Sequence, residues 1–444
     1  MADTFYFSRD TKVHLTDSAG AVYNIPVLDG FSFSQGTNVT EVTLNEMTKS
    51  DGTSRRARQM FTDSYAPAEW SFSTYIRPFA TGGADAGGEH GGSAGDEHLV
   101  EEALWNALAG KAAIGASGAG FTTSASAGTV SFANSNVAAL DTFTLTFEMG
   151  SGKATPTIYQ IADCVVNEVS IDFDIDGIAT ANWSGFGAII SDVAAMPTAT
   201  IYEGTASTDT NNFIRNRLTD LTLTNDVFET TVDGAVSSSA SVTLAAGSDL
   251  IKVGQLVTAT GVTTGTTVAA ISGTTLTLSS AMSIASGAAI TFSNVGMANS
   301  YDLTLTGGNV TISNGITYLT PETLGVVNQP LGHVTGTRSV SGNFTCYLNT
   351  PSSGNSSADL FEDIIESTSV ITNSFKLIFV IGGTSAFGTG DGPALKITLP
   401  TCHLEVPTHS IEDIVSLETT FHALPTTVDA KDETTIVAVG PSVT

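Results

Sequence analysis

The chain has 444 residues, and its 44 acidic residues outnumber its 16 lysines and arginines, which gives a net charge of −28. A protein this acidic lacks the positive surface that binds nucleic-acid phosphates. The composition therefore excludes a protein that binds DNA or RNA through the phosphate backbone of the nucleic acid. Its 3 cysteines are far apart and form no Cys-x-x-Cys pair, which predicts buried free thiols in a reducing compartment.

The chain begins Met1-Ala-Asp-Thr-Phe-Tyr-Phe, without the basic segment and apolar run of a signal peptide. No stretch reaches the roughly 18 apolar residues that a membrane-spanning helix needs. We therefore expect a protein that is made in a cytoplasm and has no membrane span.

Most of the chain consists of short segments in which apolar and polar residues alternate between Gly, Asn and Asp turns. This pattern predicts an all-β fold with minor α content. The clearest predicted strands are 39–44, 70–76, 143–147, 303–306, 375–380 and 395–399.

The polar segment 48–63, between two predicted strands, carries the basic cluster Lys49, Arg55, Arg56 and Arg58. One interpretation is a solvated loop. The other is a long hairpin arm that reaches an acidic neighbour between subunits, because arginine makes bidentate contacts with carboxylates. The corresponding segment 319–338 carries few charges, so the two arms are expected to contact different surfaces.

One pattern occurs twice and predicts an internal duplication. The strand at Phe72 reads Phe-x-x-Tyr-Ile and the strand at Phe344 reads Phe-x-x-Tyr-Leu, and a proline and a polar stretch follow each. Each copy then has a lone cysteine 19 positions before a large aromatic residue (Cys164 and Trp183; Cys402 and Phe421). Each also has a predicted amphipathic helix, over 96–110 with Asp96 as its N-cap and over 357–366.

We expect the first copy to span residues 1–197 and the second to span 198–227 and 296–430. Each copy is predicted to be a β-sandwich or barrel with one flanking helix. Residues 228–295 contain almost no aromatic residues and evenly spaced strands, which predicts a small inserted β domain of immunoglobulin-like or barrel type. Residues 431–444 are expected to form a strand or a tail.

The string Asp172-Phe-Asp174-Ile-Asp176-Gly resembles the opening of a calcium loop. Trp183 stands where an EF-hand needs a bidentate glutamate, and no helices flank the string, so an acidic strand face is the better interpretation. The Gly-rich segment with Asp85, Glu89, His90, Asp96 and His98 could be drawn as a metal site, but it matches no metal-ligand motif, so a loop is the better interpretation. Because the chain also lacks the common nucleotide, hydrolase and metalloprotease motifs, we predict no catalytic residue, no metal and no cofactor.

Taken together, the strand before the arm, the strand at Phe72, the helix and the string 163–185 resemble the tail tube (major tail) proteins of long-tailed bacteriophages. The resemblance implies a virion structural protein, assembled in the host cytoplasm, whose sheets join into stacked rings around a DNA channel. Relatives with two fused tube domains imply a homotrimer with pseudo-sixfold symmetry. Tape measure, tail-terminator and baseplate proteins are the implied partners, and genomic DNA passes without specific binding.

On that basis Asp172, Asp174 and Asp176 are expected on the lumen face of the tube. Two other interpretations stay open. The chain could be another β-rich virion protein, such as a decoration, fibre or adhesin module, which needs no duplicated order of helix and strands. It could also be a carbohydrate-binding or hydrolytic β domain, which would need paired carboxylates in an aromatic cleft.

Overall fold

The computed structural model describes residues 5–28, 30–41, 60–80, 93, 95–111, 120–132, 139–201, 212–248, 250–295, 297, 300–324, 326–350, 355–366, 375–383, 391–426 and 430–441. Within these described residues the structure is mostly β, with 57% strand, 7% helix and 2 α-helices, which confirms the expected all-β fold with minor α content.

The first copy contributes η1 (Ser8–Asp10), β1 (Thr11–Thr16), β2 (Val22–Ile25), β3 (Ser32–Glu41), β4 (Met60–Tyr75), β5 (Pro78–Ala80), β6 (Glu97–Leu99), α1 (Glu102–Leu108), β7 (Gly120–Thr122), β8 (Gly128–Ser131), β9 (Phe143–Met149), β10 (Thr157–Asp174), β11 (Thr180–Gly187) and β12 (Ile190–Asp192). The second copy contributes η4 (Asn216–Leu218), β13 (Asp220–Thr224), β20 (Ser300–Tyr301), β21 (Leu305–Ser313), β22 (Thr317–Leu319), β23 (Gly332–Val334), β24 (Ser339–Tyr347), α2 (Ser357–Glu366), β25 (Phe375–Ile381), β26 (Asp391–Leu404), β27 (Thr408–Ile411), β28 (Val415–Ala423) and β29 (Thr435–Pro441). Between β13 and β20 lie β14 (Asp226–Thr231), β15 (Val236–Thr243), β16 (Leu256–Ala259), β17 (Val268–Ser272), β18 (Thr275–Ile284) and β19 (Ala289–Ser293).

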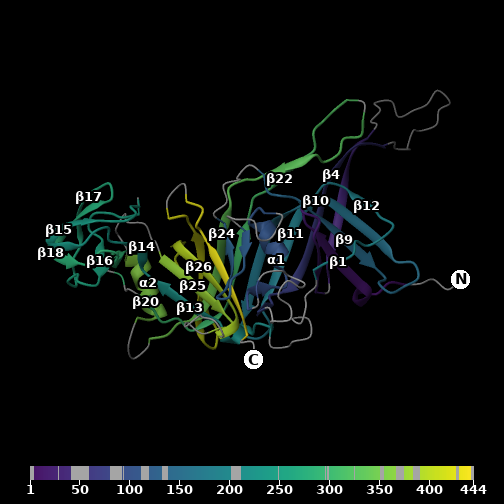
Figure 1. The fold of residues 1–444 in the computed structure, drawn as a ribbon. Coiled ribbons are helices and arrows are strands. Elements are labelled where there is room, and N and C mark those ends of the chain that lie inside the picture. The colour runs from purple at the N-terminus through teal and green to yellow at the C-terminus, as the bar shows by residue number, and fades with distance from the viewer. Residues whose placement is uncertain are drawn as a thin grey trace, which may run out of the picture.

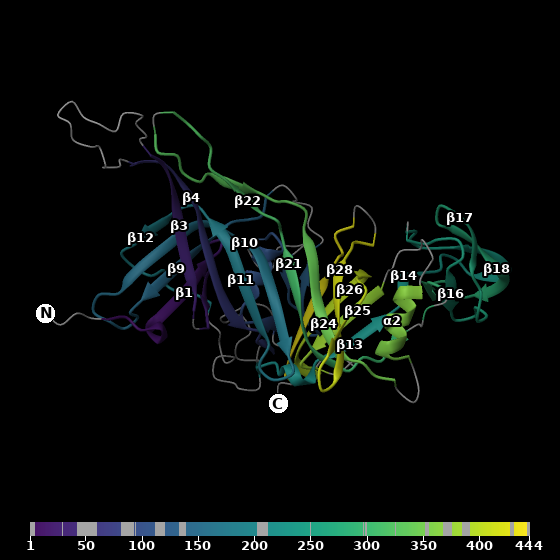
Figure 2. The ribbon, with the colours of Figure 1, turned by 180° about the vertical axis from the view of Figure 1, so that it is seen from behind.

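A single long sheet runs through both copies in the order β3-β4-β11-β10-β21-β24-β28-β27, with every pair antiparallel. The link between the copies is the β10–β21 pair, in which Ile171 lies opposite Val310 and Asp172 lies opposite Asn309. Figure 2 shows the strands from β3 to β28 side by side across the middle of the molecule. The described pairings leave the sheet open, without closure into a barrel.

Each copy adds an outer sheet that covers the long sheet. The orders are β2-β1-β9-β10-β12 in the first copy and β20-β13-β25-β26-β29 in the second. β10 and β26 are long enough to take part in both layers. Apolar side chains alternate toward the space between the layers, and one hydrophobic core extends through both copies.

The two copies pair their strands in the same way. Leu15 lies opposite Tyr23 in β1–β2, and Leu223 lies opposite Tyr301 in β13–β20. In the first copy the turn 17–21 joins the two strands, whereas in the second copy residues 225–299 stand in its place. The insertion therefore separates two strands that are neighbours in the sheet.

The inserted residues form the three-stranded sheets β14-β19-β16 and β15-β18-β17 around a hydrophobic cluster of their own. This unit lies at the end of the molecule beyond the second copy, opposite the N-terminal end (Figure 1). The domain boundaries expected from the sequence stay a prediction.

α2 spans the residues predicted for the second helix, but α1 begins later than predicted. Residues Glu97–Leu99 form β6, which pairs with β5, so the assignment of Asp96 as a helix N-cap was wrong. The cause is a tertiary contact: the backbone N–H of Gly440 donates to the carboxylate of Glu97 at 2.6 Å and holds this segment extended. Within the described residues, no helix is long and apolar enough to cross a membrane.

Candidate functional site

The face of the long sheet that points away from the core is polar in both copies. Because the strands alternate, every second side chain lies on this face. On the strands β4, β11, β10, β21, β24 and β28 the side chains are those of Glu69, Ser71, Ser73, Tyr75, Thr180, Asn182, Ser184, Phe186, Glu168, Ser170, Asp172, Asp174, Asn309, Thr311, Ser313, Ser339, Ser341, Asn343, Thr345, Tyr347, Ser416, Glu418, Thr420 and His422. Hydroxyls, amides and carboxylates dominate, and this described set contains no lysine or arginine.

Hydrogen bonds connect these side chains across the strands. Ser73 Oγ donates to Asn182 Oδ1 at 2.6 Å, and Asn182 Nδ2 donates to the carboxylate of Asp172. Thr311 of the second copy continues the series to Ser170 of the first, with 3.3 Å between their hydroxyl oxygens. The polar face is therefore one connected surface across the junction of the copies.

The structure places the predicted acidic residues in two positions. Asp172 and Asp174 lie on the polar face, beside the β21 backbone at Gly307 and Asn309. Asp176 follows the end of β10 and forms an exposed ion pair with Arg217, with 3.5 Å between Asp176 Oδ1 and Arg217 Nη1. No group of three or more His, Cys, Asp or Glu residues within the described part of the chain could hold a metal ion.

The basic residues of the first arm, Lys49, Arg55, Arg56 and Arg58, lie outside the described residues. The second arm, residues 319–338, lies across the first copy (Figure 2). The N–H of Tyr65 donates to Asn328 O at 2.9 Å, and the N–H of Asn328 donates to Asp63 O at 3.0 Å. The second arm therefore joins the β4 strand of the first copy.

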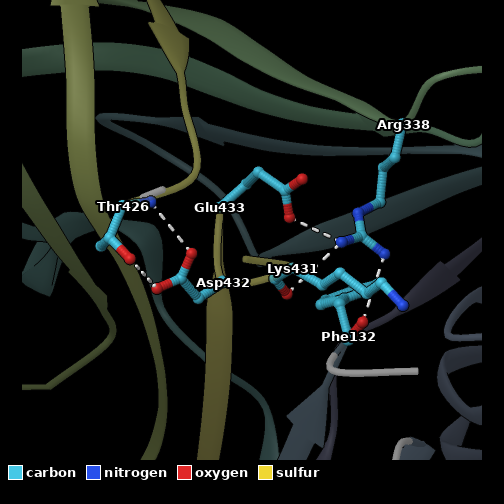
Figure 3. A network of polar contacts seen from close by, with 6 residues as sticks. All are labelled: Phe132, Arg338, Thr426, Lys431, Asp432 and Glu433. Atoms are coloured by element: carbon cyan, nitrogen blue, oxygen red, sulfur yellow. Dashed lines mark hydrogen bonds and ion pairs between the residues drawn. The ribbon is translucent and has the colours of Figure 1, made fainter. Parts of the chain in front are cut away.

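A polar network that sequence reasoning missed fixes the base of the second arm (Figure 3). Arg338 Nη2 lies 2.6 Å from Glu433 Oε2, and Arg338 Nη1 donates to Phe132 O at 3.5 Å. The guanidinium also lies over the Phe132 ring, 4.9 Å from its centroid. An arginine in a polar segment gives no sequence signal of such contacts, because its partners are about 95 and 206 residues away.

A second missed feature is a buried acidic cluster at α1. Glu97, Glu101 and Glu102 are all buried, with His98 Nδ1 2.7 Å from Glu102 Oε2. Burial raises the pKa of Glu101 to about 7, although a hydrogen bond from Trp105 and the charge of Arg77 both act to lower it. The sequence predicted an amphipathic helix over 96–110, and the pattern of charges in that segment does not show that these glutamates are buried.

No protein-family model matches the chain. The chain is similar to the tail tube protein pb6 of Escherichia phage T5, with 26% identity over 417 residues. The match covers 92% of this chain and 69% of the phage T5 protein. This homologue confirms the expected resemblance to phage tail tube proteins.

Proposed function

We propose that this homologue of a phage tail tube protein is the structural subunit of a bacteriophage tail tube. Three chains form each ring, so that six similar copies surround the channel, and the rings stack into a hollow tube. The protein is assembled in the host cytoplasm and resides in the virion tail, where it contacts tape measure, tail-terminator and baseplate proteins.

One observation supports this proposal most strongly: the β10–β21 pair continues the sheet of one copy into the next. Within the described residues, the long sheet then ends in β3 on the first copy and β27 on the second. Such edges expose unpaired backbone groups and favour pairing with another chain. Because β21 corresponds to β3, repeating the same junction between chains would be head-to-tail. Head-to-tail contacts close into rings where the rotation from one subunit to the next completes a full turn.

The polar face supports a channel wall rather than a DNA-binding surface. DNA carries one negative charge per about 1.7 Å, and proteins hold it through lysines and arginines that release counterions. The described part of the face has carboxylates, including Asp172 and Asp174, and no such cations. We assign this face to the lumen, with Asp176 in the turn at its rim.

The second arm suggests a role for the first arm. Since the second arm crosses the neighbouring copy of its own chain, the first arm is proposed to cross the neighbouring copy of the next chain. Replacing Arg55, Arg56 and Arg58 with Glu is then expected to prevent assembly while the monomer still folds. Negative-stain images together with circular dichroism spectra check both expectations, and normal tubes from this variant would remove the arm from the mechanism.

Negative-stain electron microscopy of the purified chain at rising concentration tests the proposal as a whole. Hollow filaments or stacked rings with three chains per ring are expected. If neither purified protein nor virion-derived protein forms rings, another β-rich virion protein, such as a decoration or fibre module, becomes the better assignment.

A further inference from the structure

Two short segments correspond in the two copies, although they differ in sequence. Residues 5–10, here called the N-terminal strap, precede β1, and residues 213–218, here called the inner strap, precede β13. Both start with phenylalanine and end in a 3-10 turn with a central arginine, Arg9 or Arg217.

The straps also pack in the same way on their own copies. Tyr6 lies on Gly150 and Ile214 lies on Gly382, two glycines with φ of +81°. A Cβ atom at either glycine would come within 2.4 Å of the strap side chain, so both positions require glycine for this close approach. The two straps are therefore structural equivalents.

The inner strap is held by the first copy. The N–H of Ala179 donates to Ile214 O at 3.0 Å, and the N–H of Asn216 donates to Gly177 O at 3.2 Å. The ring of Phe213 packs edge-on against Tyr75, with 5.4 Å between the centroids. These contacts, beside the Arg217–Asp176 ion pair, leave Ile214 0% exposed.

The N-terminal strap lacks this cover in the single chain. Phe5 is 74% exposed and Tyr6 is 41% exposed, which is unusual for adjacent aromatic side chains. Among the described residues, no carboxylate lies within ion-pair distance of Arg9. The N-terminal strap therefore presents the same kinds of side chain as the inner strap, but no described part of its own chain covers them as the first copy covers the inner strap.

The other half is exposed at the opposite end of the long sheet. The turn between β27 and β28 corresponds to the turn between β10 and β11, and it carries Glu412 and Asp413 between two exposed isoleucines, Ile411 and Ile414. Tyr347, at the end of β24, takes the place of Tyr75 at the end of β4. This surface offers acidic and apolar groups to a basic and aromatic strap.

We propose that the N-terminal strap of one chain docks on the β27–β28 turn of the next chain in the ring. Arg9 faces Glu412 and Asp413, and Phe5 packs against Tyr347. The partner is a second copy of this chain, and the inference rests on the proposed ring. An exposed ion pair contributes little stability, so its effect is on the choice of partner and the rate of encounter, while the aromatic residues supply buried apolar area.

Cysteine cross-linking tests the contact directly. The chain with both Arg9→Cys and Asp413→Cys is assembled and treated with a short bismaleimide. The native cysteines are 0% exposed and do not compete. We expect covalent dimers and trimers on a denaturing gel. The matched pair Asp176→Cys and Arg217→Cys should link within one chain, so that variant should still run as a single chain.

The outcomes separate the strap from the ring. Assembled particles without covalent links between chains would contradict the docking of the strap on the next chain, while the tube proposal would still hold. A chain that forms no ring or filament at any concentration, even when taken from virions, would overturn both.

Charge reversal gives a second measure. Arg9→Glu is expected to raise the protein concentration needed for assembly about fivefold at low salt. This factor corresponds to the free energy of the strongest exposed ion pairs. Adding Glu412→Arg and Asp413→Arg to that chain should restore assembly. Lys252→Glu, an exposed charge reversal in the inserted unit, is the control and should change nothing. Equal effects of Arg9→Glu and Lys252→Glu would contradict the strap.

Discussion

Glu101, at the start of α1 in the first copy, is a carboxylic acid whose side chain is buried, with the residue 1% exposed. Burial raises its pKa from 4.5 to about 7, so the folded protein retains a proton that the unfolded chain releases near pH 4.5. The contribution of Glu101 to the free energy of unfolding therefore falls as the pH rises from about 4.5 to 7, by up to about 3 kcal/mol, and changes little above that range.

Glu101→Gln removes this pH dependence, because the amide stays neutral. We expect the variant to match the original chain at pH 5 and to be more stable at pH 8, by about 1 to 3 kcal/mol. Thermal unfolding between pH 5 and 8 measures the difference, with the exposed Glu322→Gln as the control. A variant that is less stable at pH 8 would show that Glu101 is ionised and paired.

Arg338 and Lys376 provide a comparison between a partly buried and an exposed ion pair. The side chains of Arg338 and Glu433 are 18% and 13% exposed, whereas those of Lys376 and Glu229 are 26% and 51% exposed. Arg338→Ala is expected to cost about 2 kcal/mol, since it leaves Glu433 without its guanidinium. Lys376→Ala should cost less than about 1 kcal/mol.

A double-mutant cycle with Glu433→Gln, followed by urea unfolding, isolates the pairwise contribution. If Arg338→Ala and Lys376→Ala cost the same, then the network in Figure 3 does not hold the second arm.

Single residues show what sequence spacing can reveal. The equal spacing of Cys164 to Trp183 and Cys402 to Phe421 pointed to the duplication, and all four side chains are buried in the core. Alternation with period two marks such residues because one face of each strand is apolar. The two straps were missed because their sequences have only the phenylalanine, the arginine and the following threonine in common. These are too few residues to reveal a repeat.

The junction of the two copies depends on the β10–β21 pair, where Gly308 lies opposite Phe173 on one side and Phe344 on the other. A Cβ atom at this position would come within 2.4 Å of the carbonyl oxygen of Asn343. Gly308→Val therefore forces the strands apart, and we expect a loss of about 1 to 3 kcal/mol or more.

Gly332→Val is the matched control, because no heavy atom lies within 4 Å of a Cβ atom at that position. Chemical unfolding measures both variants, and limited proteolysis locates the loosened junction. Equal stability of the two variants would show that the close packing at Gly308 does not hold β21 between its neighbours β10 and β24.

At the level of elements, the strands were more predictable than the first helix. Local alternation specifies a half-buried strand, and α2 agrees with its apolar periodicity. The segment at Glu97 has the same acidic, helix-like pattern, but a contact with Gly440, 343 residues away, makes it a strand. No local pattern contains that information, and the same is true of the pairing between β10 and β21.

At the scale of the whole molecule, the insertion explains why the duplication is faint in sequence. The equivalent pairs Leu15–Tyr23 and Leu223–Tyr301 are separated by 8 and 78 positions, so no fixed repeat period exists. Only the folded structure brings Thr224 opposite Ser300, as it brings Thr16 opposite Val22. The mode of assembly needs a second chain, so the sequence could suggest it only through resemblance to a family.

This geometry leads to a deletion experiment. Residues 225–299 can be replaced by the sequence of the first-copy turn 17–21, because both connect the same antiparallel strand pair. The turn brings its own stabilisation, since Asp17 Oδ1 accepts the N–H groups of Ala19 and Ala21 at 2.9 and 2.8 Å. The inserted unit has a separate hydrophobic cluster, so its removal should leave the main core intact.

The contacts between the inserted unit and the second copy that this variant loses include the Ser248–Thr426 hydrogen bond at 3.0 Å and the Lys376–Glu229 pair at 3.3 Å. We expect the shortened chain to unfold within a few degrees of the original and to form rings of unchanged symmetry with a smaller outer diameter, as seen by electron microscopy. Because the insertion lies at the outer sheet, away from the polar face, the proposed channel should keep its width. A folded variant that no longer assembles would instead place the inserted unit in the contacts between chains.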